Sequence, residues 1–295
     1  MGLFFSSDRF TRPGPGVRPD APRKKGVARL AEIMGRDMWN FFRAGFLAFL
    51  GCLPFIIGMF FAVETHALLF MLLAGIIGGL IAGPELSAMA DTVLRSLRDE
   101  PGYWWETYRR VWKRNARESL VPGMLTGLVL SMQIFTLFHM SVISAGIVTW
   151  VLLILSFVIT LGLESYIWPQ IALLDLPLYG ILKNSLLLFL GYLPRSLGAI
   201  AIKAVYWGAI LLFFPLTTII LPFTNFWLPM LPALLCIYQP LNKCFTIEST
   251  INKMREDDLN AALAKDNEPL PEDPAAEAEE TSEEPASDDS SSDAQ

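Results

Sequence analysis

Two histidines, His66 and His139, are the only imidazoles available for acid–base or metal chemistry in this sequence. Imidazole exchanges a proton near neutral pH and is a common metal ligand. A metal or proton-transfer role would require both rings and a carboxylate such as Glu64, and these groups are divided between separate predicted loops. We therefore expect both histidines to be solvated loop residues, with no metal site and no cofactor.

Three cysteines, Cys52, Cys236 and Cys244, lie in or beside apolar runs. An odd, scattered set indicates buried thiols, because it matches neither a disulfide framework nor a paired C-x-x-C metal site. The sequence also lacks a G-x-x-x-x-G-K-[ST] phosphate loop and the H-E-x-x-H and G-x-S-x-G motifs. We predict no catalytic residues, and we expect that the protein is not an enzyme.

Apolar residues dominate the composition, and the charge is divided unevenly along the chain. Hydrophobic residues make up 53% of the 295 positions and charged residues 18%, whereas soluble domains have roughly 45–50% and about 25%. Residues 256–295 hold 15 of the 29 acidic residues and one lysine, so this tail carries a net charge of −14 and the rest +8. We predict a membrane-embedded body and an acidic, disordered cytoplasmic tail.

Long apolar runs define the predicted body at residues 30–250, which follows a basic arm rich in Pro and Gly at residues 1–29. A hydrocarbon core about 30 Å thick requires roughly 17–25 helical residues. Six runs meet or approach this length, at residues 44–63, 67–82, 121–138, 145–163, 197–221 and 226–241. Such continuous runs predict helices rather than barrel strands. The expected fold class is therefore an all-α integral membrane protein with six transmembrane helices.

The basic residues predict the orientation of these helices. None of the 23 Lys and Arg residues falls in the connections 64–66, 139–144 or 222–225. Cytoplasmic loops carry the excess of positive charge, so both termini are expected in the cytoplasm and residues 178–190 as an apolar helix at the inner interface. A seventh span at residues 186–202 is the alternative, but it would place Arg195 near the bilayer centre at a cost of about 2.5–3.5 kcal/mol.

Two patterns in and after the second run predict contacts. Gly75, Gly79 and Gly83 repeat every four residues, a spacing that lets helix backbones approach closely within one chain or across a dimer. A later stretch combines aromatic and basic side chains on a predicted interfacial helix, at Trp104, Trp105, Tyr108, Arg109, Arg110, Trp112, Lys113 and Arg114. Such side chains favour the anionic headgroups of the inner leaflet or a cytosolic partner. No recognised nucleic-acid-binding module surrounds them.

Several short motifs together resemble the YesL-like family of bacterial membrane proteins. They are MGLFF at residues 1–5, DMWNFF at 37–42, Leu53-Pro54, ELSA at 85–88 and the stretch 104–115. The resemblance covers about residues 1–250 and implies a plasma-membrane protein that assists carbohydrate ABC importers, with permease subunits as partners and no catalytic residues. We therefore expect an auxiliary subunit of an oligosaccharide importer. A stand-alone small-solute transporter or channel, or a structural or regulatory membrane scaffold, remains the alternative.

Overall fold

The computed structural model describes residues 23–100, 102–140 and 146–266, and these residues form helices without any strand. The chain divides into two compact units, Met1–Ile247 and Glu248–Gln295, which are described separately. Six helical segments of the first unit are long and apolar enough to cross a membrane. They are α2 (Gly26–Thr65), the continuous α3–η1–α4 (Leu68–Leu73, Ala74–Gly78 and Gly79–Arg98), α5 (Trp104–Phe138), α6 (Ile147–Leu173), α8 (Leu193–Leu212), and α9 with α10 (Leu221–Thr224 and Trp227–Phe245). The prediction of an all-α fold with six helices long and apolar enough to cross a membrane is confirmed.

The chain between the fourth and fifth of these segments does not form the additional spanning helix of the seven-helix alternative. Helix α7 (Leu178–Gly191) ends before α8 begins, and Tyr192 between them leaves helical geometry, with φ −120° and ψ 42°. Pro194 breaks a continuous helix here because it has no amide hydrogen to donate to the Leu190 carbonyl, four residues earlier, and its ring clashes with that carbonyl. The predicted run 186–202 is therefore not one helix, and the 14 residues of α7 span about 21 Å, too little to cross a bilayer.

Other boundaries also differ from the sequence-based ranges. The fifth apolar run was expected to continue to Leu221, but α8 ends at Leu212 and is followed by turns and the short η2 (Leu216–Thr218). Pro215 lies in this stretch, where it removes a backbone donor that a longer helix needs. In the second unit, α11 (Ile247–Asp266) carries helix through Glu256 to Asp266, a stretch predicted to be disordered. Residues 1–22 of the basic arm and 267–295 of the acidic tail lie outside the described residues.

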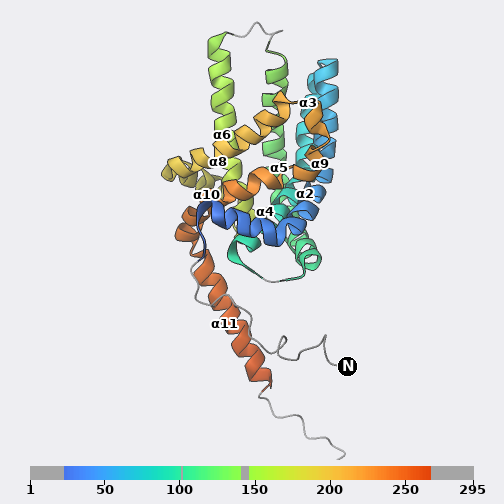
Figure 1. Ribbon diagram of the computed structural model, residues 1–295. Helices are drawn as coiled ribbons and strands as arrows, with labels where there is room; N and C mark the ends of the chain where they lie inside the picture. Colours follow the sequence, from blue (N-terminus) through green and yellow to red (C-terminus); the bar gives the residue numbers. More distant parts are fainter. Residues whose placement is uncertain (1–22, 101, 141–145, 267–295) are drawn as a thin grey trace, which may run out of the picture. The chain divides into compact units, whose positions relative to one another are not determined.

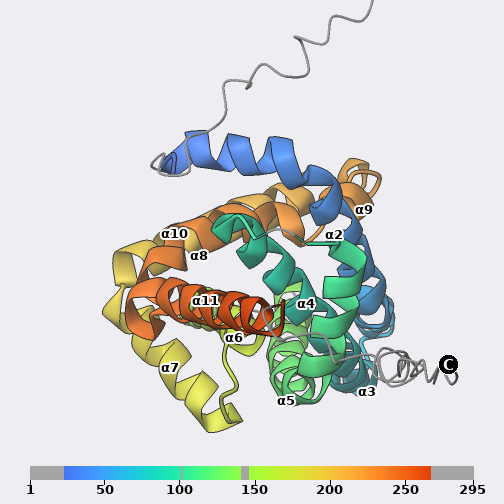
Figure 2. The same ribbon diagram turned by 90° about the horizontal axis from the view of Figure 1, so that it is seen from below.

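Helix α4 is the central element of the first unit. Every residue from Leu86 to Leu94 is buried, and α4 contacts α2, α5, α6 and α10. In Figure 1, α5, α6 and the later turns of α2 run upright, while α8 and α10 cross them obliquely. Figure 2 shows the same bundle from below, with the first turns of α2 along one side of it. A helix buried all round belongs to a packed core, so α4 fixes the positions of its neighbours.

Helix α5 is longer than a bilayer requires. Its 35 residues extend about 52 Å, against a hydrocarbon core about 30 Å thick. Its apolar second half corresponds to the predicted span at residues 121–138, and its first turns carry the aromatic and basic side chains singled out in the sequence. Those first turns therefore extend past the apolar segment as part of the same rigid helix.

Candidate functional site

A glycine seam holds α4 against α5 and sets the register between them. Ideal Cβ atoms placed at Gly79 and Gly83 would collide with the backbone carbonyl oxygens of Gly123 and Ser119 on α5. A Cβ at Gly75 would lie 2.5 Å from Ser131 Oγ. Only glycine permits this approach, in which dispersion contacts accumulate along two backbones. The three predicted packing glycines therefore contact a helix of the same chain.

The aromatic stripe, defined here as Trp104, Tyr108 and Trp112, contacts α4 through the polar atoms of its last two members. The Tyr108 hydroxyl donates to Glu85 Oε2 at 2.5 Å, and Trp112 Nε1 donates to Glu85 Oε1 at 2.9 Å. Tyr108 is 4% exposed. Because the two carboxyl oxygens of Glu85 each accept from a different turn of α5, Glu85 fixes the rotation of α5 about its own axis.

The first member of this stripe and its neighbour lie in a different environment. Trp104 contacts the guanidinium of Arg43, whose Cζ lies 5.7 Å from the indole centroid, and its Nε1 is buried without a hydrogen-bond partner among the described residues. Trp105 is 57% exposed. The sequence grouped all these aromatic residues as lipid or partner contacts, whereas the structure turns Tyr108 inward and leaves Trp105 outward.

The basic stripe, defined as Arg109, Lys113 and Arg117, lies on the outer side of the same turns. All three residues are exposed, and none of them makes an ion pair or side-chain hydrogen bond within the part of the chain that the structure describes. The two other predicted cations are engaged, because Arg110 pairs with Glu106 at 3.0 Å and Arg114 donates to the Ala172 carbonyl at 2.8 Å. The four-residue spacing of the stripe places its three charges on one face.

The C-terminal end of α4 carries an arginine cluster that the sequence analysis missed. Arg29 donates to the Leu97 carbonyl at 3.1 Å and to Asp99 Oδ2 at 2.6 Å, while Arg36 donates to the Ser96 carbonyl at 2.8 Å and to Asp99 Oδ1. Both arginines come from α2. Cations at a helix C-terminus satisfy its free carbonyls and oppose the negative end of its dipole. The cluster therefore secures the start of α2 to the end of α4.

The two arginines change the pKa of the Asp99 carboxyl. Partial burial acts to raise the pKa of its carboxyl, but the hydrogen bonds and charges of Arg36 and Arg29 outweigh burial and lower the pKa below its usual value. Its backbone φ of 59° is left-handed, which ends α4 at this residue. Asp99 therefore stays ionised to lower pH than a free carboxyl.

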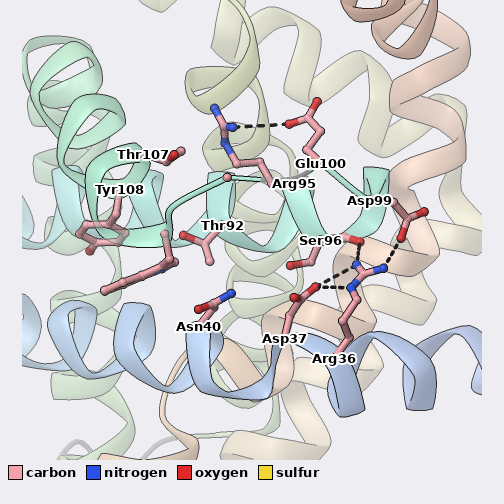
Figure 3. A pocket seen from close by; sticks show the side chains of 12 residues that line it. Arg36, Asp37, Asn40, Thr92, Arg95, Ser96, Asp99, Glu100, Thr107 and Tyr108 are labelled. Carbon is pink, nitrogen blue, oxygen red and sulfur yellow. Dashed lines mark hydrogen bonds and ion pairs between the residues drawn. The ribbon is translucent and has the colours of Figure 1, made fainter. Parts of the chain in front are cut away.

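A cavity of about 320 Å³ lies between α2, the end of α4 and the start of α5, as Figure 3 shows. Its charged walls are already paired internally, since Arg36 binds Asp37 and Asp99 while Arg95 pairs with Glu100 at 3.7 Å. These ion pairs connect α2, α4 and the residues that follow α4, and they leave no unpaired charge among these residues to bind an ion. The cations of the basic stripe, by contrast, are exposed and make no such pairs among the described residues.

Of the two histidines expected in solvated positions, His66 is exposed but His139 is buried. His66 Nδ1 lies 2.6 Å from His139 Nε2, and His139 is 6% exposed. Among the described residues, no group of three or more His, Cys, Asp and Glu side chains is placed to hold a metal ion. The cysteines are free, with Cys52 buried, Cys236 half-buried and Cys244 exposed, so the last departs from the expected buried thiol.

Comparisons of this chain with protein-family models, with curated proteins and with solved structures found no match. The functional argument therefore depends on the geometry described above. Its main parts are the hydrogen bonds of Tyr108 and Trp112 to Glu85 and the exposed basic stripe on the same turns of α5.

Proposed function

We propose that this protein is an accessory subunit of a membrane transport complex and binds a neighbouring subunit through the basic stripe of α5. The observation that carries the proposal is the orientation of the aromatic stripe. Aromatic side chains that anchor a helix in lipid lie among the headgroups, whereas Tyr108 and Trp112 donate to Glu85 on α4. Helix α5 is therefore held by protein contacts, and the unpaired cations of the basic stripe form a preorganised surface for an acidic partner.

For the partner, we propose the permease subunits of a carbohydrate ABC importer in the bacterial plasma membrane. The short motifs similar to YesL-like proteins support this identification. Cytoplasmic placement of both termini is supported by the distribution of the 23 Lys and Arg residues, which avoid residues 64–66, 139–144 and 222–225. With this orientation, the basic stripe lies at the cytoplasmic face, where it can meet partner loops as well as anionic lipid.

Affinity purification from the native membrane in mild detergent, followed by mass spectrometry, tests the proposal. We expect permease subunits of an importer in amounts comparable to this chain. Deleting the gene is then expected to reduce oligosaccharide uptake. A purified species that contains only this chain, together with unchanged uptake across many sugars, would contradict the accessory role and favour a stand-alone transporter, to be tested by flux in liposomes.

Charge-reversal variants test the docking surface itself. The triple variant R109E/K113E/R117E is expected to abolish co-purification, because it replaces three unpaired cations with carboxylates that repel an acidic partner. The matched control E106R/R110E exchanges the ends of an existing ion pair and keeps the net charge, so it should retain the partner. Co-purification that survives the triple variant in a folded protein would assign the basic stripe to lipid instead.

Cysteine accessibility tests the proposed orientation. Single cysteines at positions 224 and 285 should be labelled from opposite sides of the membrane if six helices cross it. The exposed Cys244 is first replaced by Ser, so that it does not react. Labelling of both positions from the same side would overturn the six-helix topology.

A further inference from the structure

The two histidines of the chain meet at the end of α5 that is distant from Asp99. His66 follows the last residue of α2, and His139 follows the last residue of α5. Their ring centroids lie 4.8 Å apart with the ring planes at 83°, and His66 Nδ1 is 2.6 Å from His139 Nε2. Two residues that are 73 positions apart in the sequence thus place one ring nitrogen each side by side.

The surroundings of His139 determine which of its nitrogens carries a lone pair. Its Nδ1 lies 2.7 Å from the Phe135 carbonyl oxygen, and its ring stacks on the Phe135 ring with centroids 4.0 Å apart. A carbonyl oxygen only accepts hydrogen bonds, so Nδ1 of His139 carries the proton and Nε2 presents a lone pair toward His66. A hydrogen bond from the remote ring nitrogen to a carbonyl is the arrangement that orients metal-binding histidines.

We propose that His66 and His139 form a binding site for a borderline divalent transition-metal ion, with Zn²⁺ or Cu²⁺ as the ions best suited to two imidazoles. The ligand atoms are His66 Nδ1 and His139 Nε2. His66 binds as a neutral ring after its proton moves from Nδ1 to Nε2, so the step changes neither oxidation state nor the total number of protons. Imidazole nitrogens suit these two ions, and Cu²⁺ binds most tightly in the divalent series.

The required movement is small and falls on the residue that can make it. Nitrogens about 2.0–2.1 Å from a tetrahedral ion lie about 3.3 Å from each other, so the rings must separate by about 0.7 Å from the present 2.6 Å. His66 is exposed and sits in a left-handed turn with φ 53°, while His139 is buried and fixed. With no third protein ligand within the described ranges, water completes the coordination. The bound ion ties the end of α2 to the end of α5.

Metal titration of the purified full-length chain in detergent tests the site. The protein is chelator-treated, carries a tag without histidine and has Cys244 replaced by Ser, so that no exposed thiol competes for the ion. We expect one Zn²⁺ per chain by calorimetry, and a Cu²⁺ electron paramagnetic resonance spectrum with two nitrogen ligands. H66Q and H139Q should each weaken binding by about tenfold or more, whereas E64Q, which leaves both imidazoles, should bind as the parent does.

Two results would overturn this proposal without bearing on the docking surface of α5. One is Zn²⁺ binding no tighter than that of the H66Q/H139Q double variant. The other is a Cu²⁺ spectrum with fewer than two nitrogen ligands. This result would mean that the two histidines only form a hydrogen bond with each other. If H139Q does not fold, H66Q decides alone, because His66 is exposed and its replacement leaves the His139–Phe135 contacts in place.

Discussion

Replacing Gly127 with Ala tests whether the glycine seam sets the position of α5. A Cβ at Gly127 would lie 2.5 Å from the Gly75 carbonyl oxygen and 2.7 Å from Gly79 Cα, both of which are backbone atoms on the opposite helix. Ordinary van der Waals contact begins at 3.4 Å, so the helices must part locally by about 0.9 Å. Backbone atoms cannot rotate away as a flexible side chain can, so the whole seam has to adjust.

The expected cost follows from this overlap. Inserting one carbon into a well-packed interface costs about 1–3 kcal/mol, and a change of 1 kcal/mol shifts the Tm of a domain of 150–250 residues by about 2–4 °C. G127A should therefore lower the Tm by several degrees. It should also weaken the contacts of Tyr108 and Trp112 with Glu85, because these depend on the same register between α4 and α5.

The matched control is G208A, since a Cβ at Gly208 on α8 meets nothing within 4 Å. Both variants make the same chemical change inside a helix, so their difference isolates the overlap. Thermal unfolding in detergent gives the Tm, and tryptophan fluorescence reports changes around the eight tryptophans, Trp112 among them. A G127A protein as stable as G208A, with the parent emission spectrum, would refute the claim that the seam fixes α5.

Three further substitutions test the polar contacts. E85Q should cost about 0.5–1.5 kcal/mol, because the amide nitrogen cannot accept and one of the two donors, the buried Tyr108 hydroxyl or the exposed Trp112 Nε1, loses its acceptor. Thermal unfolding measures this loss beside Y108F, which removes a donor instead, and equal stability of E85Q and the parent would contradict the assigned hydrogen bonds. K203M should cost about 3–5 kcal/mol, because it removes the cation whose Nζ lies 3.8 Å from the Glu164 carboxylate. In a double-mutant cycle, E164Q/K203M should recover most of this loss of stability. Additive losses would show that the pair is not coupled. Because the folded pKa of Asp99 is lowered, its stabilising effect is present above the ordinary carboxyl pKa and is lost as pH falls through the folded pKa. D99N should therefore be less stable than the parent near neutral pH and approach it in acid; a gap that stays constant with pH would exclude this contribution.

The sequence determined the class of the protein because the governing signals are local. The length of each apolar run predicts a membrane-spanning helix without knowledge of its neighbours. The seven-helix alternative failed at Pro194, a residue whose local effect is also visible in the sequence. Boundaries were less certain, as at Leu212, because a run of apolar residues does not show where a helix ends inside it.

Tertiary structure decided the contacts on which the functional proposals depend. The spacing of Tyr108 and Trp112 showed that they share a face, but only the packing of α5 on α4 turned that face toward Glu85 and left the basic stripe outside. The meeting of His66 and His139 likewise depends on how α2 and α5 end beside each other, across 73 residues of chain. Periodicity relates residues within one helix, whereas the rotation and register of two helices are set by close packing between them, here by glycines that allow backbones to touch.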